Sequence, residues 1–217
     1  MPFEYQFPDP RTADADGLLA VGGDLSIESL VAAYSRGIFP WYEEDSPILW
    51  WSPDPRLILY PGKFRVSGSL DQKIRTDKFR VKTDSAFEEV IRNCAAVNRD
   101  GQRGTWITKD MMQAYIRLHH AGFAHSFETW HNDRLVGGLY GVSLGRAFFG
   151  ESMFTKKSQG SKIALAFLIE RLVKRGFVLL DVQLLNPHLE LFGAVEISED
   201  EYNNLLVSAL TTAVTFN

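Results

Sequence analysis

The chain has 217 residues, of which 45% are hydrophobic and 23% charged, and its formal net charge is −4. This composition is typical of a folded globular protein and excludes the disordered and fibrous classes. No apolar run approaches the roughly 20 residues of a membrane-spanning helix, and the N-terminal string MPFEYQFPDPRTADADG lacks the features of a signal peptide. Because Cys94 is the single cysteine, no internal disulfide is expected, and the chain is predicted to be cytoplasmic without membrane association.

The first 61 residues are rich in Pro, Trp and Gly and are expected to form a small N-terminal domain. The string DLSIESLVAAYSRGIF predicts a short helix that is capped by Ser26 and ended by Gly37. Residues 48–60 form two apolar stretches around a proline-rich turn. The string YPGK at 60–63 marks the expected boundary, so the second domain is predicted to span residues 62–217.

The second domain alternates between helical and strand patterns. Helices are expected at residues 85–97, 108–122, 160–176 and 200–214, and strands at 79–83, 124–130, 134–144, 146–154 and 177–185. The turn HNDR, which contains Asp133, predicts a hairpin between the strands on either side of it. Helices that flank a mainly antiparallel sheet define the α+β class.

Charge is unevenly distributed along the chain. Residues 63–82 contain seven Lys or Arg against two Asp, whereas the part after Arg175 contains six acids and no Lys or Arg. Such a basic segment could bind a polyanion, and a solvated surface segment explains the composition equally well.

Polar residues interrupt two apolar strands. Glu151 lies within RAFFGESMF, and Asp181 and Gln183 lie within VLLDVQLL. Because side chains two positions apart share a strand face, Glu151 is expected beside Met153 and Asp181 beside Gln183, with Val182 pointing away. An acid among apolar residues is costly without a partner or a function. The three polar residues therefore predict either a buried site for proton transfer and oxyanion stabilisation or a structural hydrogen-bond network.

Other sites are not indicated by the sequence. Three histidines, His119, His120 and His125, lack companion ligands at metal-binding spacing, so no metal is expected. There is no phosphate-binding loop, dinucleotide fingerprint or nucleophile elbow, so no cofactor is predicted. Four tryptophans lie in or near turns, where they belong either to the core or to a surface that stacks on nucleic-acid bases; they are Trp41, Trp50, Trp51 and Trp106.

Several longer strings occur in a characteristic order: GLLAVGGDLS, AYSRGIFPW, ILWWSPDPR, GTWIT, LVGGLYGVSLG, FFGESMF and DVQ. Together they resemble the bacterial leucyl/phenylalanyl-tRNA–protein transferase family over residues 15–195. The resemblance implies a C-terminal domain related to GCN5-type (GNAT) acetyltransferases. It also implies transfer of leucine or phenylalanine, with methionine as a further donor residue, from aminoacyl-tRNA to proteins with N-terminal Arg or Lys. The product would enter N-end-rule degradation, and the enzyme would act as a monomer without metal, ATP or acyl-CoA.

The resemblance also implies roles at matching positions. Asp181 and Gln183 would act on the attacking amine and on the ester carbonyl or its oxyanion, and Glu151 would lie near the cationic N-terminus of the acceptor. The remaining expectations fall into three groups: Trp41 and Trp106 stack on the terminal adenosine; Leu139, Phe148, Met153, Tyr34 and Tyr115 form the aminoacyl pocket; and Lys73, Arg75, Lys78 and Arg80 of the basic segment contact the tRNA backbone.

Some positions depart from the family pattern. Gly68, Asp71 and Gln72 dilute the basic segment, Val182 replaces a cysteine, and the string HLELFGAVEISEDEY differs from the usual C-terminal sequence. Two alternatives therefore stay open. An acyl-CoA-dependent N-acetyltransferase is disfavoured because KKSQGSK does not match the pyrophosphate-loop pattern, and a non-catalytic tRNA- or peptide-binding protein is disfavoured because the polar residues are intact.

Overall fold

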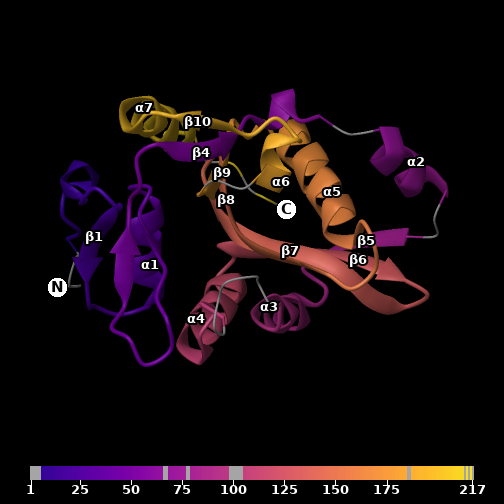
Figure 1. The fold of residues 1–217 in the computed structure, drawn as a ribbon, viewed down its shortest axis with the longest axis horizontal. Coiled ribbons are helices and arrows are strands. Elements are labelled where there is room, and N and C mark those ends of the chain that lie inside the picture. The colour runs from indigo at the N-terminus through magenta and orange to yellow at the C-terminus, as the bar shows by residue number, and fades with distance from the viewer. Residues whose placement is uncertain are drawn as a thin grey trace.

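The computed structural model describes residues 6–65, 68–76, 79–97, 105–184, 187–212, 214 and 216. In this part of the chain a three-stranded sheet near the N-terminus lies beside a seven-stranded sheet that carries helices on both faces (Figure 1). The predicted α+β class is confirmed, whereas the relationship to GCN5-type acetyltransferases stays a prediction. None of the helices in these residues is long and apolar enough to span a bilayer.

The small sheet is antiparallel and has the order β1-β3-β2, with β1 at Leu18–Val21, β2 at Phe39–Pro40 and β3 at Leu49–Trp51. The 3-10 helix η1 (Pro10–Thr12) precedes it, and helix α1 (Ile27–Tyr34) connects β1 with β2. As predicted, Ser26 caps α1 by accepting a hydrogen bond from the Ser29 N–H, and Gly37 takes a left-handed conformation after the helix.

The large sheet has the order β10-β4-β9-β8-β7-β6-β5. Its strands are β4 (Arg56–Leu59), β5 (Phe79–Thr83), β6 (Ala124–His131), β7 (Arg134–Leu144), β8 (Ala147–Thr155), β9 (Leu179–Gln183) and β10 (Val195–Ile197). All neighbours pair antiparallel except β8 and β9, which pair parallel. The predicted hairpin joins β6 to β7, with Asn132 and Asp133 at positive φ in its turn.

The other helices are η2 (Pro61–Lys63), α2 (Gly68–Thr76), α3 (Phe87–Ala95), α4 (Lys109–His120), α5 (Gly160–Lys174), α6 (Pro187–Glu190) and α7 (Glu199–Leu210). The prediction found α3, α4, α5 and α7 but not α2, α6 or the short strands β1, β2 and β10. These elements are short or largely polar, so their hydrophobic periodicity is weak.

Strand β4 bears on the expected domain boundary at residue 61. Although β4 lies on the N-terminal side of YPGK, it pairs with β9 and β10 inside the large sheet. The two-domain division stays a proposal, and this pairing favours a boundary that lies before Arg56.

Two hydrophobic clusters cover the two faces of the large sheet. One contains residues of α1, α3, α4 and α7, and the other lies mainly between the sheet and α5. Figure 1 shows α3 and α4 on one side of the strands and α5 and α6 on the other. The candidate site lies where these two layers and the N-terminal segment meet.

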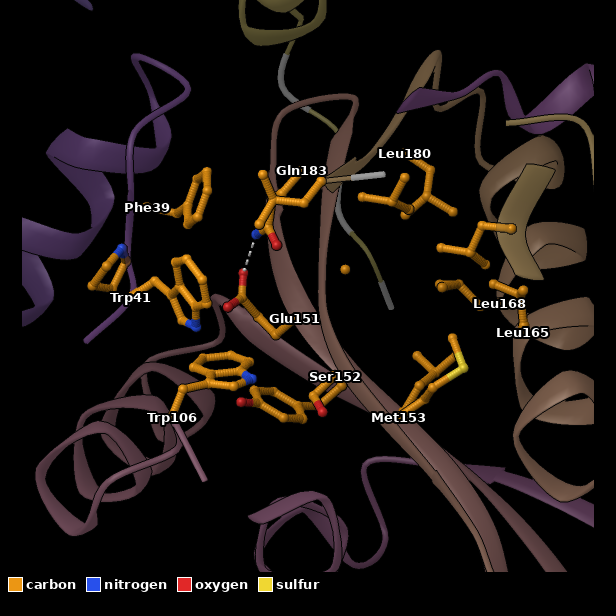
Figure 2. A pocket seen from close by; sticks show the side chains of 17 residues that line it. Phe39, Trp41, Trp106, Glu151, Ser152, Met153, Leu165, Leu168, Leu180 and Gln183 are labelled. Atoms are coloured by element: carbon orange, nitrogen blue, oxygen red, sulfur yellow. Dashed lines mark hydrogen bonds between the residues drawn. The ribbon is translucent and has the colours of Figure 1, made fainter. Parts of the chain in front are cut away.

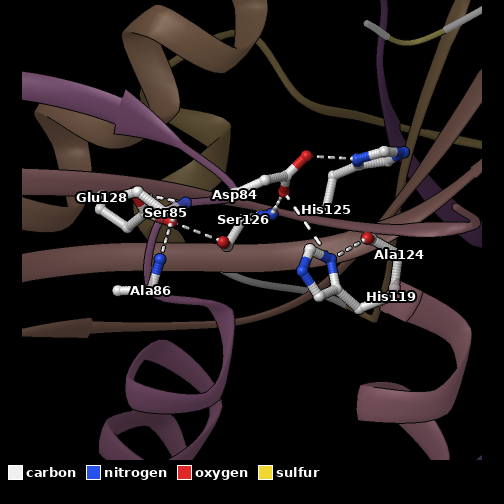
Figure 3. A network of polar contacts seen from close by, with 8 residues as sticks. All are labelled: Asp84, Ser85, Ala86, His119, Ala124, His125, Ser126 and Glu128. Atoms are coloured by element: carbon white, nitrogen blue, oxygen red, sulfur yellow. Dashed lines mark hydrogen bonds and ion pairs between the residues drawn. The ribbon is translucent and has the colours of Figure 1, made fainter.

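A buried polar network fixes the turn between β5 and α3 onto β6 (Figure 3). Glu128, which is fully buried, accepts hydrogen bonds from the Ser85 N–H at 3.0 Å and from the Ala86 N–H at 3.2 Å, beside the N-terminus of α3. Asp84 accepts hydrogen bonds from His125 Nδ1 at 2.7 Å and from the Ser126 N–H at 2.8 Å. A carboxylate that receives N-terminal N–H groups stabilises a helix, so this network is structural.

Candidate active site

A cavity of about 310 Å³ opens where strands β8 and β9 separate (Figure 2). The two strands pair up to Phe149 and Asp181. Beyond this point, residues 150–153 of β8 and residues 182–184 at the end of β9 line the cavity. The remaining wall residues come from the N-terminal segment, from the residues before α4 and from β7, β9, α5 and α6: Phe39, Pro40, Trp41, Trp106, Leu139, Tyr140, Leu165, Leu168, Leu180 and Leu189.

A β-bulge sets the direction of Glu151. Gly141 pairs with Gly150 and Tyr140 pairs with Ser152, so Glu151 is the extra residue on β8. A bulge shifts the alternation of side chains by one position, and bulges commonly re-aim a side chain next to a functional site. Consequently Glu151 turns toward α1 and α4, while Met153 packs against the cluster under α5. The expectation that these two residues share one face is wrong, although both line the cavity.

Glu151 is surrounded by hydrogen-bond donors. Its Oε1 accepts from the Tyr34 hydroxyl at 2.8 Å and from Gln183 Nε2 at 3.0 Å, and its Oε2 lies within hydrogen-bond distance of the Tyr115 hydroxyl, at 3.0 Å. The two tyrosine hydroxyls also contact each other. Burial raises the pKa of Glu151 to about 7, against the lowering effect of these donors and with a smaller contribution from the charge of Asp181.

The two tyrosines belong to the surroundings of the cavity. Tyr34 and Tyr115 are almost completely buried and are not among its wall residues, and their part in the aminoacyl pocket stays a prediction. Their rings belong to the core cluster, and their hydroxyls reach Glu151.

Gln183 ends β9 in a left-handed conformation, with φ at 68°. Its backbone N–H donates to Asp181 Oδ1 at 2.9 Å, which supports this unusual conformation for a residue other than glycine. The turn directs the Gln183 amide toward Glu151 in the cavity, as Figure 2 shows. Val182 also lines the cavity, contrary to the expectation that it points away.

Asp181 faces the opposite way from the cavity. It is fully buried and is not a wall residue, so the expectation of a common face with Gln183 is wrong. Its Oδ2 lies 3.3 Å from Arg56 Nε and accepts a hydrogen bond from the Tyr202 hydroxyl at 2.7 Å. A cation and a hydroxyl donor therefore hold Asp181 in place between β4 and α7.

Arg56 and Tyr202 are the residues that the sequence reasoning missed. The Arg56 guanidinium lies over the rings of Phe39 and Tyr202, at 5.1 and 4.5 Å from their centroids, and donates to the Gly37 carbonyl. It thus joins the N-terminal wall of the cavity to β9 and α7. Arg56 stands in the quoted string WWSPDPR, but no local pattern indicates that its partners come from residues 181 and 202.

The end of the cavity away from Trp41 is apolar. Met153 on β8 faces Leu165 and Leu168 of α5 across this end (Figure 2), and Leu139, which pairs with Met153, also lines the cavity. Two of the five residues predicted for the aminoacyl pocket thus belong to the wall. Phe148, another of the five, is fully buried and is not among the wall residues.

The opposite end carries two aromatic rings. Trp41 and Trp106 are partly exposed and line the cavity, with Trp106 near the start of α4. Trp41 is supported by Trp51, whose ring centroid lies 5.5 Å from its own and whose Nε1 donates to the Trp41 carbonyl at 2.6 Å. The arrangement offers flat surfaces for a planar ligand, as predicted for a base.

The predicted basic residues lie outside the cavity wall. Arg75 is exposed on α2 and pairs with Asp71 at 3.0 Å, and Arg80 on β5 lies 3.9 Å from Asp133. Lys73 on α2 is half-buried, and Lys78 lies outside the described residues. Their contact with a nucleic acid stays a prediction.

The site is suited to group transfer, because one cavity combines an apolar pocket, an ionisable carboxyl group, an amide and two aromatic surfaces. Comparison with protein families agrees. The model for "Leucyl/phenylalanyl-tRNA protein transferase" matches residues 58–207, and the model for the N-terminal domain of the same protein matches residues 23–54. The chain therefore belongs to the leucyl/phenylalanyl-tRNA protein transferase family and is an aminoacyltransferase.

Individual relatives support the assignment. The chain is 56% identical to the leucyl/phenylalanyl-tRNA–protein transferase of Anaeromyxobacter sp. (strain Fw109-5), over 97% of this chain and 89% of the relative. Its identity to the enzyme named likewise in Syntrophobacter fumaroxidans is 53%, over 97% of this chain and 90% of that one. A solved structure, L-PGS from Bacillus licheniformis, covers 84% of this chain and 57% of its own at 12% identity and a TM-score of 0.40, which is too distant to inform the site.

Proposed function

We propose that this protein transfers leucine or phenylalanine from aminoacyl-tRNA to the α-amine of proteins that begin with Arg or Lys. The observation that carries the proposal is the cavity itself, in which Glu151 and Gln183 lie between an apolar pocket and a pair of tryptophans. Family membership supports the same donor and acceptor. The enzyme would act in the cytoplasm as a monomer, where both substrates are available.

The donor would span the cavity from end to end. The terminal adenosine would stack against Trp41 and Trp106, and the leucine or phenylalanine side chain would enter the pocket formed by Leu139, Met153 and Leu165. Methionine is flexible and polarisable, so a pocket with Met153 in its wall suits both side-chain shapes. Selection against smaller side chains would be modest, because each methylene contributes about 1–3 kcal/mol in such a pocket.

The reaction would occur beside Glu151 and Gln183. The α-amine of the acceptor attacks the ester carbonyl of the donor, a C–N bond forms, and the ribose oxygen leaves with its bonding electrons and takes up a proton. The Gln183 amide is placed to donate to the developing oxyanion, and Glu151 is the carboxyl group among the described wall residues. Because the ester is already activated, positioning the two reactants would supply much of the rate.

Asp181 would act as a positioning residue in this scheme. Its carboxylate accepts a hydrogen bond from the Gln183 backbone N–H at 2.9 Å and is itself held by Arg56, so it would act on the reaction through Gln183. The contact surface for the tRNA backbone would include Lys73, Arg75 and Arg80, with Lys78 beside them in the sequence.

The proposal is tested by label transfer from Phe-tRNA to two peptides that differ only in their first residue, Arg or Ala. Transfer to the Arg peptide alone is the expected result. No transfer, with Phe-tRNA still bound, would instead support a non-catalytic tRNA-binding protein. Binding of acetyl-CoA in isothermal titration would support the alternative of an N-acetyltransferase.

A further inference from the structure

Glu151 and the two tyrosines next to it form more oxygen–oxygen contacts than the tyrosine hydroxyls have protons. Three oxygen–oxygen contacts form a closed ring: Tyr34 hydroxyl to Glu151 Oε1, Tyr115 hydroxyl to Glu151 Oε2, and Tyr34 hydroxyl to Tyr115 hydroxyl. Each contact needs one proton between its oxygens, since two lone pairs would otherwise face each other. Two neutral tyrosines supply only two protons.

A protonated carboxyl group supplies the third proton. If Oε2 of Glu151 carries it, Glu151 donates to Tyr115, Tyr115 donates to Tyr34, and Tyr34 donates to Oε1. Gln183 Nε2 then still donates to Oε1, which has two lone pairs. Every contact in the ring is satisfied, whereas an ionised Glu151 leaves one contact without a proton.

The surroundings of the ring favour the neutral form. The titratable and charged groups that act on it come from four elements: Tyr34 on α1, Tyr115 on α4, Tyr140 on β7 and Asp181 on β9. Burial raises the pKa of Tyr34 and Tyr115 well above the usual value, so both hydroxyls keep their protons. Arg56, the cation beside Asp181, is paired with that carboxylate, and no cation is among the described groups that shift the pKa of Glu151. No positive group in this set therefore stabilises an ionised Glu151.

We infer that Glu151 is neutral in the resting enzyme and that Tyr34 and Tyr115 form with it a closed proton relay that serves the transfer reaction. The relay moves one proton from each member to the next, so that Oε2, beside Tyr115, loses a proton and Oε1, beside Gln183, gains one. Oε1 then donates its proton to the leaving ribose oxygen as the C–O bond breaks, and the carboxylate takes back one proton from the nitrogen of the new C–N bond. Amine and ester thus become amide and free hydroxyl, and Glu151 ends the cycle neutral.

This inference deepens the proposed function and rests on it for the transfer step, but the protonation state can be tested without substrate. Infrared difference spectra between the wild type and Glu151→Gln isolate the carboxylic-acid band of Glu151, which can be titrated from pH 5 to 9. The band is expected to be present at pH 6 and to disappear with a midpoint near the pKa of about 7.

The variants Tyr115→Phe and Tyr34→Phe test whether the tyrosines stabilise the neutral or the ionised form of Glu151. In the closed ring Tyr115 accepts the Glu151 proton, so its loss is expected to lower the midpoint by about one pH unit, the shift expected for one lost hydrogen bond. If the tyrosines only donate to an ionised carboxylate, the same change raises the midpoint. Tyr60→Phe, which removes a hydroxyl that donates to the exposed Glu201 at 3.1 Å, is the matched control and should leave the midpoint unchanged.

Absence of the band at pH 6, or a midpoint that stays or rises in Tyr115→Phe, would overturn the inference while leaving the label-transfer result intact. Should Tyr115→Phe fail to fold, the wild-type spectrum still gives the answer, because it shows directly whether Glu151 carries a proton at pH 6. In the transfer assay the two variants are expected to lower kcat about tenfold, with the KM for the donor unchanged, as loss of a proton relay predicts.

Discussion

Two carboxyl groups lie on the neighbouring strands β8 and β9, and each contacts a tyrosine hydroxyl, yet their surroundings differ in one respect. Asp181 has the guanidinium of Arg56 at 3.3 Å, and Glu151 has hydroxyls and an amide but no cation among its described contacts. The comparison teaches that partners decide the role of a carboxyl group: an ion pair ties Asp181 into the fold, whereas neutral partners hold Glu151 in the cavity wall.

Gln183 connects these two clusters. Its backbone N–H donates to Asp181, and its side-chain amide donates to Glu151. The structural cluster, defined as Arg56, Asp181 and Tyr202, thereby fixes the geometry of the reactive cluster, defined as Tyr34, Tyr115 and Glu151.

The largest effect is expected from breaking the structural cluster with Arg56→Met. The change leaves the fully buried Asp181 without its cation, and removing one partner of a buried ion pair costs about 3–5 kcal/mol. Urea unfolding measures the loss. The control is Arg75→Met, because Arg75 forms an exposed pair with Asp71 and should change stability by less than about 1 kcal/mol. Equal losses in both variants would contradict the assignment of Arg56 to a structural cluster.

The connection between the clusters is tested by Gln183→Ala. Loss of the amide that donates in the cavity should lower kcat by about 10²–10³-fold, the range seen when one oxyanion donor is removed. The free energy of unfolding should change little, because the Gln183 backbone keeps its bond to Asp181. Label transfer to the Arg peptide measures the rate, and Gln113→Ala, at an exposed position of α4, serves as the control. A rate within a factor of three of the wild type would remove Gln183 from the reaction.

A smaller loss of stability is expected for Tyr202→Phe, which keeps the ring over Arg56 but removes the hydroxyl that donates to Asp181 at 2.7 Å. A hydrogen bond to a charged group contributes about 1.5–3 kcal/mol. Thermal or urea unfolding should show this loss, whereas Tyr60→Phe removes an exposed hydroxyl and should cost less than about 0.5 kcal/mol. If Tyr202→Phe and Tyr60→Phe lower the free energy of unfolding equally little, the Tyr202 hydroxyl of α7 does not stabilise the fold through Asp181.

The last prediction concerns the pH dependence of stability, and it isolates the contribution of Glu151. The pKa of Glu151 is about 7 in the folded state and close to 4.5 in the unfolded chain, so the folded state binds more protons between these values. The contribution of Glu151 to stability is therefore full below about pH 4.5 and is lost as the pH rises through 7. Urea midpoints at pH 5 and pH 8 should differ more for the wild type than for Glu151→Gln. If the midpoint changes equally between pH 5 and pH 8 in the wild type and in Glu151→Gln, the pKa of Glu151 is not raised in the folded state.

Much of the local structure could be predicted because its causes lie close in the sequence. The cap at Ser26 and the hairpin at Asp133 depend on residues within a few positions of one another, and both were found where expected. The carboxylate beside the N-terminus of α3 could not be predicted in this way, since it comes from Glu128 on another strand. Local rules identify a capping residue only when it is a neighbour in sequence.

The sequence by itself determined the α+β class, the family and the identity of the polar residues in the site, because periodicity, turn residues and motif strings are local properties. Only the tertiary structure decided how these residues act. The bulge at Glu151 and the left-handed turn at Gln183 break the simple alternation of strands, and so they reverse the expected faces of Met153, Val182 and Asp181. The cation that holds Asp181 and the hydroxyls that hold Glu151 come from distant segments, and the dielectric and charge environment they create exists only when the chain is folded.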